Sequence, residues 1–180
     1  MFIIKNDIEN QIEIKKSKFI CLIYHIDNLE LVDRTLKEAK EKYKNATHYC
    51  YAYNINGIMK CSDDKEPSGT AGIPMLDVIK LKDLTNVLVI VIRYFGGVKL
   101  GASPLLRAYR TSVIEALNKT DIIPYKKYIN KTITLPLNMN NKLQKLERKY
   151  EVIDKKYQEN IEITFKIKEE DIENFNNDIK

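Results

Sequence analysis

The alternation of apolar and polar residues divides the first two thirds of the chain into strands separated by helices. Residues 86–94 are nearly all apolar and β-branched, which predicts a strand buried on both faces. The dipeptide Asn56-Gly57 separates two short strand-like runs and is typical of a two-residue hairpin turn. The pattern predicts strands over 17–26, 48–55, 58–62 and 86–94.

Apolar residues at helical spacing predict three helices in the same part of the chain. Asn28 can cap the first helix, and Pro74 falls in the first turn of the second. Ser103 is suited to the N-cap of the third helix, and Pro104 to its first position. The predicted helices cover 29–43, a segment from 71–74 to 81, and 104–118.

A domain boundary is predicted near 119–126, where Pro124 interrupts the pattern, so we expect domains over 1–122 and 123–180. Beyond this boundary the order strand, helix, strand, strand, helix is that of a split βαβ unit without its last strand. These elements are predicted over 127–135, 138–149, 150–157, 160–168 and from 169 to the end.

The composition is that of a soluble protein, with 44% hydrophobic and 31% charged residues. No apolar run approaches the ~20 residues that span a bilayer, and the first residues lack the features of a secretory signal. The three cysteines form no CxxC pair, which fits a reducing compartment better than a disulfide framework. We therefore expect a cytoplasmic protein with no membrane partner.

The charge and the glycines both draw attention to the middle of the chain. A formal net charge of +5 does not by itself mark a nucleic-acid binder. However, four cations and no acid lie between Arg93 and Arg110, and five of the six glycines lie within residues 61–117. A chain that concentrates its special-backbone residues in one region is expected to build its shaped site there.

Five segments carry a resemblance to a known family. They are KSKFI at 16–20, ATHYCYAY at 46–53, CSDDKEPSGTAGIPML at 61–76, RYFGGVKLG at 93–101 and LLRAY at 105–109. In this order and spacing they resemble the IMPACT/YigZ family over about 16–118. The sequence departs from the family pattern at Lys65, where Gly is usual, and at Ser103-Pro104, where two small residues are usual.

The resemblance implies a mixed α/β (α+β) protein of two small domains similar to the fourth and fifth domains of elongation factor G. The first would share a left-handed βαβ fold with a small-subunit ribosomal protein, and the second would be ferredoxin-like, here without its last strand. Eukaryotic relatives add an N-terminal module that engages amino-acid-starvation control of translation. That module is expected to be absent, because only about 15 residues precede KSKFI.

Two glycine-rich loops, EPSGTAGIP and GGVKLGASP, each lead into a predicted helix. A helix start exposes unpaired N–H groups and the positive end of a dipole, and glycines let several N–H groups face one anion. The hypothesis is one anion-binding face made of Ser68, Gly69, Thr70, Gly72, Arg93, Gly96, Gly97, Lys99, Arg107 and Arg110. The alternative is that the glycines serve tight turns and close packing while the cations are solvated.

Other candidate residues have a chemical and a structural interpretation. Asp63, Asp64 and Glu66 could bind Mg²⁺ or act as acid and base, or they could pair with Arg93 or Arg107. The remaining candidates are His48, Cys50 and Cys61 as a zinc or Cys–His site, and Tyr49, Tyr51, Tyr53, Tyr94 and Phe95 as base-stacking residues. For most of these side chains a structural role in the sheet is favoured.

The function that these observations favour is a non-enzymatic, translation-linked regulatory factor that binds RNA or the ribosome. One alternative is a protein-interaction regulator of a stress or translation-control pathway. Another is a phosphate-directed small-molecule enzyme that uses the acidic cluster. No complete catalytic constellation is visible, and the sequence predicts no cofactor and no metal.

Overall fold

The computed structural model describes all residues from 1 to 180, and the chain divides into two compact units. Unit 1 covers Met1–Tyr125 and unit 2 covers Lys126–Lys180. The domain boundary expected between 122 and 123 lies a few residues before this division. Each unit has a hydrophobic core of its own. None of the helices combines the length and the apolar character needed to cross a membrane.

Unit 1 is built on an antiparallel sheet of five strands in the order β2-β3-β6-β4-β5. Strand β6 lies at its centre, and its side chains from Val87 to Arg93 are buried, as the apolar run predicted. The strands are β2 (Ile8–Ile14), β3 (Ser17–His25), β4 (His48–Ile55), β5 (Ile58–Ser62) and β6 (Val87–Tyr94). The hairpin predicted at Asn56-Gly57 joins β4 to β5, and both turn residues have positive φ.

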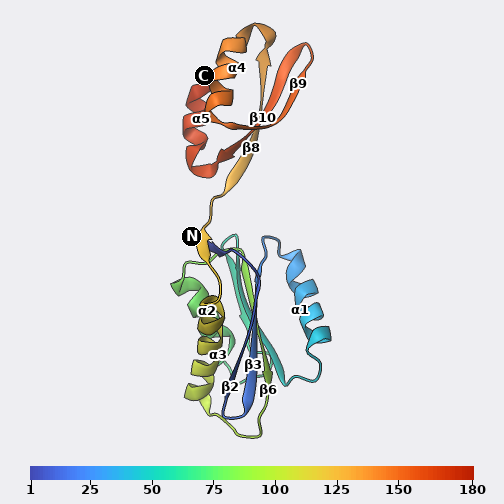
Figure 1. Ribbon diagram of the computed structural model, residues 1–180, viewed down its shortest axis with the longest axis vertical. Helices are drawn as coiled ribbons and strands as arrows, with labels where there is room; N and C mark the ends of the chain where they lie inside the picture. Colours follow the sequence, from blue (N-terminus) through green and yellow to red (C-terminus); the bar gives the residue numbers. More distant parts are fainter. The chain divides into compact units, whose positions relative to one another are not determined.

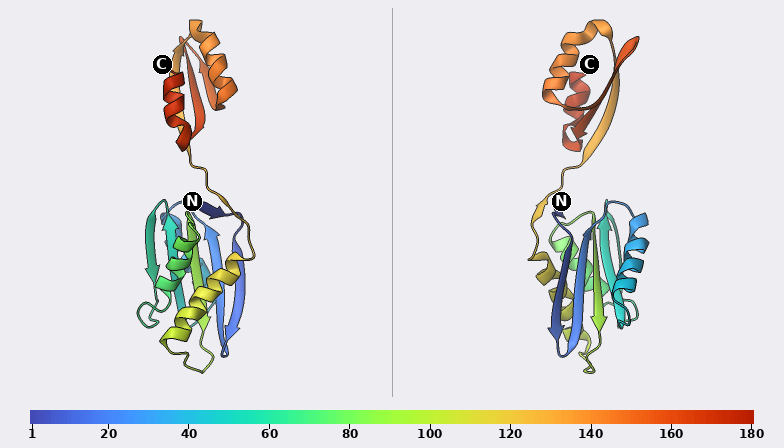
Figure 2. Two further views of the ribbon diagram at one scale, coloured as in Figure 1. Left: turned by 90° about the vertical axis from the view of Figure 1, so that its left-hand side faces the viewer. Right: turned by 45° about the vertical axis from the view of Figure 1, so that its right-hand side comes forward.

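Three helices cover the sheet of unit 1: α1 (Glu30–Lys42), α2 (Gly72–Leu81) and α3 (Ala102–Leu117). Helix α1 lies on one face, and α2 and α3 lie on the other (Figures 1 and 2). Because side chains alternate along a strand, β3 and β6 contribute to both layers. Phe19 and Val91 join the core beneath α2 and α3, whereas Ile20 and Ile90 join the core beneath α1.

Two starts of helices test the capping predictions. The Asn28 side chain accepts a hydrogen bond of 2.9 Å from the Glu30 N–H, as expected of a cap. The cap predicted at Ser103 is wrong. Helix α3 begins at Ala102, directly after Gly101, whose φ of +79° only glycine adopts without strain. Ser103 therefore lies inside the first turn.

Three strands of unit 1, namely β1 (Phe2–Ile4), β2 and β7 (Ile122–Pro124), were not predicted from the sequence. Strand β2 precedes the predicted strand 17–26 and pairs with it along its whole length. A separate two-stranded ribbon joins β1 to β7. The ribbon ties the first residues of unit 1 to its last ones, which short apolar runs alone do not reveal.

Unit 2 follows the predicted order of strand, helix, strand, strand and helix. Its antiparallel sheet has the order β8-β10-β9, and both helices contribute to the single core of this unit. The elements are β8 (Tyr128–Pro136), a 3-10 turn (Leu137–Met139), α4 (Asn140–Lys149), β9 (Glu151–Tyr157), β10 (Asn160–Lys168), a second 3-10 turn (Glu169–Asp171) and α5 (Ile172–Asp178). The expected mixed α/β class is confirmed for the chain.

Candidate functional site

The start of α2 is closed by a carboxylate of the protein itself. Asp63 accepts hydrogen bonds from the N–H groups of Gly69 at 2.9 Å, Ala71 at 3.0 Å and Gly72 at 2.8 Å. Partial burial raises the pKa of Asp63, but these three backbone donors outweigh it and hold the pKa below its usual value. The first predicted anion-binding loop thus holds an anion, and that anion is Asp63.

The remaining groups of this loop are also engaged or turned outward. The Thr70 hydroxyl donates to the Pro67 carbonyl oxygen at 2.6 Å, and Ser68 is exposed. At Gly72, a Cβ would lie 2.9 Å from the backbone nitrogen of Ser62, so no larger residue fits there. For Gly72, the close-packing interpretation therefore describes the observed geometry.

Asp63, Asp64 and Glu66 do not form one acidic site. The Asp64 carboxylate accepts from the Tyr49 N–H at 2.6 Å, while its carbonyl oxygen lies 2.8 Å from Nδ1 of His48. Glu66 is buried and faces the interior of unit 1. No group of three or more His, Cys, Asp or Glu side chains gathers anywhere in the structure as metal ligands. The three neighbouring acids bind three different parts of the fold.

Arg93 is an interior residue, which corrects its assignment to the anion-binding face. Its Nη1 donates to Oε1 of Glu66 at 2.6 Å, and only 6% of the Arg93 side chain and 3% of the Glu66 side chain are exposed. The Tyr109 hydroxyl donates to the same oxygen at 2.8 Å. Burial first, and then the neighbouring Cys50 and Glu66, raise the pKa of Tyr109. A buried charge pair of this kind has a structural role, and its charges are not accessible to a ligand at the surface.

The histidine and cysteines of the middle segment are part of the same interior. Nε2 of His48 lies 3.7 Å from Glu66 Oε1. The Cys50 thiol donates to the Asp63 carbonyl oxygen at 3.0 Å, and burial raises its pKa. Cys61 is half-buried, and burial also raises its pKa. These thiols lack the low pKa of a reactive cysteine, so the structural interpretation describes them.

The second glycine-rich loop, 96–101, is docked on the β2–β3 turn. The Gly96 N–H donates to the Ser17 hydroxyl at 3.2 Å, and a Cβ at Gly96 would lie only 2.0 Å from the carbonyl carbon of Lys16. Gly97 and Gly101 both have positive φ. The loop therefore needs glycine for close contact at Gly96 and for backbone conformation at Gly97 and Gly101.

Docking this loop on the turn gathers lysines that are far apart in the sequence. The turn and the loop lie at the same end of the sheet in unit 1 (Figure 1). We call this end, with its six exposed lysines, the basic end; its lysines are Lys15, Lys16, Lys18, Lys44, Lys65 and Lys99. No ion pair joins any of the six to an acid. Glu13 is the cross-strand neighbour of Lys18.

Arg107 and Arg110 lie on the first half of α3, next to the loop that carries Lys99. Both arginines are exposed, and neither forms an ion pair. Sequence reasoning found Lys99, Arg107 and Arg110 because they lie in one acid-free run. Sequence reasoning missed the lysines at the β2–β3 turn, Lys44 in the α1–β4 loop, and Lys65, because only the order of strands in the sheet brings them to this end.

The aromatic residues divide into packed and exposed groups. Tyr53 is buried and stacks on Tyr51 with ring centroids 6.3 Å apart, and the Tyr49 hydroxyl donates to the Tyr43 carbonyl oxygen. The packing favoured for these tyrosines is the arrangement observed. Phe95 differs, because 46% of it is exposed.

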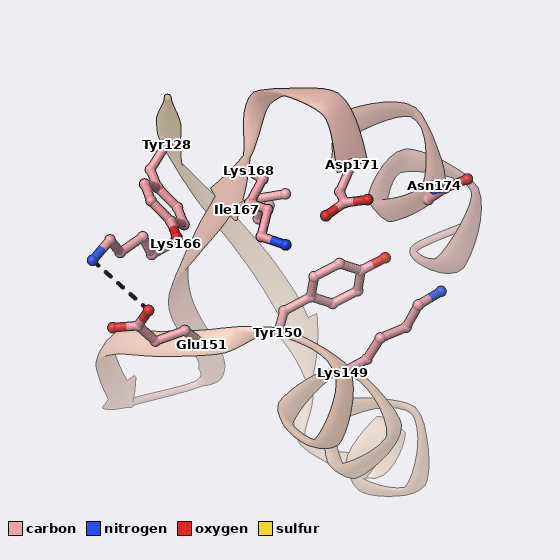
Figure 3. Close-up of a pocket in the computed structure, with 9 residues that line it drawn as sticks. All are labelled: Tyr128, Lys149, Tyr150, Glu151, Lys166, Ile167, Lys168, Asp171 and Asn174. Atoms are coloured by element: carbon pink, nitrogen blue, oxygen red, sulfur yellow. Dashed lines mark ion pairs between the residues drawn. The ribbon is translucent and has the colours of Figure 1, made fainter. Parts of the chain in front are cut away.

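Unit 2 contains a hollow of about 290 Å³ between the ends of its strands and the start of α5 (Figure 3). Several of the charged side chains around it form ion pairs within unit 2. Lys149 pairs with Asp178 at 2.6 Å, and Lys166 lies 3.8 Å from Glu151, as the dashed line in Figure 3 marks. Three lysines and two acids line this hollow, so most of the charge is offset and it offers no strong field to a charged ligand.

Comparison with known proteins places this arrangement in a family. Residues 15–117, more than half of the chain, match the Impact N-terminal domain family. The chain belongs to the IMPACT family. The matched segment contains both glycine-rich loops, the Arg93–Glu66 pair and all six lysines of the basic end.

Two IMPACT family members show how far the similarity extends. YvyE of Bacillus subtilis is 44% identical over 128 residues, which are 69% of this chain and 59% of YvyE. A Haemophilus influenzae member is 33% identical over 177 residues, which are 93% of this chain and 84% of that protein. A solved structure described as that of a hypothetical protein superposes with a TM-score of 0.73 at 25% identity, over 97% of this chain and 88% of that one.

Proposed function

We propose that this IMPACT family member is a cytoplasmic, translation-linked regulatory factor that binds RNA or the ribosome through the basic end of unit 1. The observation that carries the proposal is the separation of charges at this end. The neighbouring acids Asp63, Asp64 and Glu66 are engaged by the protein's own donors, while six lysines remain exposed without ion pairs.

In this proposal the lysines contact backbone phosphates. Each exposed ammonium is a flexible point charge that needs no fixed geometry to meet a phosphate, so the binding is largely independent of sequence. Lys99, Arg107 and Arg110 extend the cationic surface along α3. Gly72 and Arg93 are buried beneath this surface, while Gly96 and Gly97 shape the loop that leads to Lys99. The link to translation rests on the resemblance to elongation factor domains, which is a likeness of fold.

A protein partner is the second candidate, and exposed apolar side chains favour it. Phe95 and Val98, in the segment between β6 and α3, and Leu106, in the first half of α3, are all more than a third exposed. Exposed aromatic and aliphatic residues next to cations are also typical of protein interfaces. Binding to a protein through these side chains would depend only weakly on salt.

The proposal is tested by sedimentation with purified ribosomes and separated subunits at low and at moderate salt. Wild type is compared with Lys16→Glu/Lys99→Glu and with the control Lys82→Glu/Lys119→Glu, which makes the same charge change after the C-terminal ends of α2 and α3. Circular dichroism first establishes that all three are folded. We expect wild type and the control to co-sediment at low salt, and the Lys16/Lys99 variant to remain at the top. Wild type that stays at the top even at low salt contradicts the proposal.

A further inference from the structure

We infer that Phe95 is a platform on which one unpaired nucleobase stacks. The inference rests on the proposed RNA binding and names the kind of RNA: single-stranded or looped, with at least one base free. Phe95 is the first residue after β6, at the basic end; 46% of it is exposed, and it belongs to none of the hydrophobic cores. An exposed ring at a cationic surface is the arrangement that proteins use for single-stranded nucleic acid.

The ring of Phe95 is supported from the interior by Arg93. The guanidinium carbon of Arg93 lies 5.7 Å from the centroid of the Phe95 ring and 5.4 Å from that of the Phe19 ring. Phe19 is fully buried and is the cross-strand neighbour of Arg93. The guanidinium thus contacts one core ring and one surface ring, and both contacts are of the cation–π kind.

Arg93 in turn is fixed by its 2.6 Å bond to Glu66. Its Nε has no hydrogen-bond partner although it is buried, so the guanidinium is not oriented by polar bonds on every side. In this position the guanidinium both hydrogen-bonds to the Glu66 carboxylate and contacts the Phe95 ring. This arrangement gives the buried ion pair a role at the surface: it holds the support of Phe95 in place.

The backbone on both sides of the ring is also fixed. The Phe95 N–H donates to the Thr47 hydroxyl at 3.0 Å, and the Gly96 N–H donates to the Ser17 hydroxyl at 3.2 Å. The close contact of Gly96 with Lys16 leaves no room for this segment to shift inward. A ring on a fixed backbone loses little conformational entropy when a base stacks on it, and this favours affinity.

The cations around Phe95 are placed to hold the strand that carries the base. Lys16 adjoins Gly96 through the backbone contact, Lys99 lies four residues beyond Phe95, and the Lys44 carbonyl oxygen accepts from the hydroxyl of the neighbouring Tyr94 at 3.1 Å. These lysines belong to three loops at the same end of the sheet. A duplex satisfies them through its phosphates but offers no free base, so the ring discriminates between single-stranded and duplex RNA.

The experiment measures the affinity of the full chain for a fluorescent oligouridylate about ten nucleotides long and for an RNA duplex of the same length, at one fixed low salt concentration. The variants are Phe95→Ala, Phe95→Trp and Val98→Ala; the last truncates another exposed apolar residue in the same segment. Thermal melting confirms that each variant is folded. We expect Phe95→Ala to weaken binding of the single strand by about 5- to 140-fold. Duplex binding should stay unchanged, Phe95→Trp should retain single-strand affinity, and Val98→Ala should match wild type.

Two results overturn the inference while leaving the proposed function intact. One is a Phe95→Ala variant that binds the single strand as tightly as wild type. The other is a variant that loses affinity equally for both RNAs, since a stacking ring affects only a strand with a free base. If wild type binds neither RNA, the proposed function itself is contradicted, and so is the inference that Phe95 stacks on a base.

Discussion

Nη1 of Arg93 lies 2.6 Å from Oε1 of Glu66, and both side chains are almost completely enclosed in unit 1. The two residues come from different parts of the sequence, because Glu66 lies in the loop before α2 and Arg93 lies near the end of β6. Their contact joins the acidic loop to the central strand. The pair therefore belongs to the framework that holds the basic end in shape.

This contact predicts an asymmetric response to mutation. Glu66→Ala leaves the Arg93 charge buried without its partner, and we expect it to lower the free energy of unfolding by about 3–5 kcal/mol. The double variant Glu66→Leu/Arg93→Met removes both charges, and it should lose much less stability than Glu66→Ala. Urea unfolding followed by circular dichroism measures both effects.

The exposed neighbour Lys65 supplies the control for this series. Lys65→Ala should change the free energy of unfolding by less than about 0.5 kcal/mol. A Glu66→Ala variant as stable as this control would show that the ion pair does not support the fold. Tyr109→Phe, which removes one donor to Glu66, should fall between the two.

The carboxylate of Asp63 predicts a specific dependence of stability on acid. The N–H groups of Gly69, Ala71 and Gly72 hold its folded-state pKa below the ordinary value of 3.8, although burial opposes them. A carboxylate with a lowered pKa contributes stability that is fully present above its ordinary pKa and is lost as the pH falls through the folded-state value. Asp63→Ala should therefore cost about 1–3 kcal/mol at pH 7, and the difference from wild type should shrink below about pH 3.8.

Unfolding of wild type and Asp63→Ala in urea at a series of pH values from neutral to strongly acidic measures this difference. Asp77→Ala, an exposed acid on α2, is the control and should follow wild type throughout. A difference between wild type and Asp63→Ala that stayed constant down to strong acid would mean that the three N–H groups do not depend on the charge of Asp63.

Most of the elements could be predicted from the sequence because their signals are local. The apolar run of β6, the Asn56-Gly57 turn and the Asn28 cap each act within a few residues. The start of α3 shows the limit of such signals. Ser103 is a good capping residue, but the positive φ of Gly101 starts the helix before it.

The candidate site could be predicted only where it is continuous in sequence. The run of cations from Arg93 to Arg110 stood out, and pairing of the nearby acids with Arg93 was one interpretation, but local sequence does not decide between that pairing and a surface position for Arg93. Lys16 joins Lys99 because β3 pairs with β6 and Gly96 contacts the β2–β3 turn. Pairing of strands distant in sequence is not encoded in local periodicity, so the basic end appears only in the folded chain.

The most direct test of the account is the salt dependence of RNA affinity, because it counts the phosphates that the basic end contacts. The affinity for an oligouridylate is measured by fluorescence anisotropy over a range of salt concentrations, and the logarithm of the binding constant is plotted against that of the salt concentration. Each phosphate contact with a single strand contributes about −0.7 to the slope. We predict a slope of about −4 for wild type if all six lysines contact phosphates, and one reduced in magnitude by about 1.4 for Lys16→Ala/Lys99→Ala. A wild-type slope near zero, or the same slope in both proteins, would contradict the claim that the lysines of the basic end bind RNA.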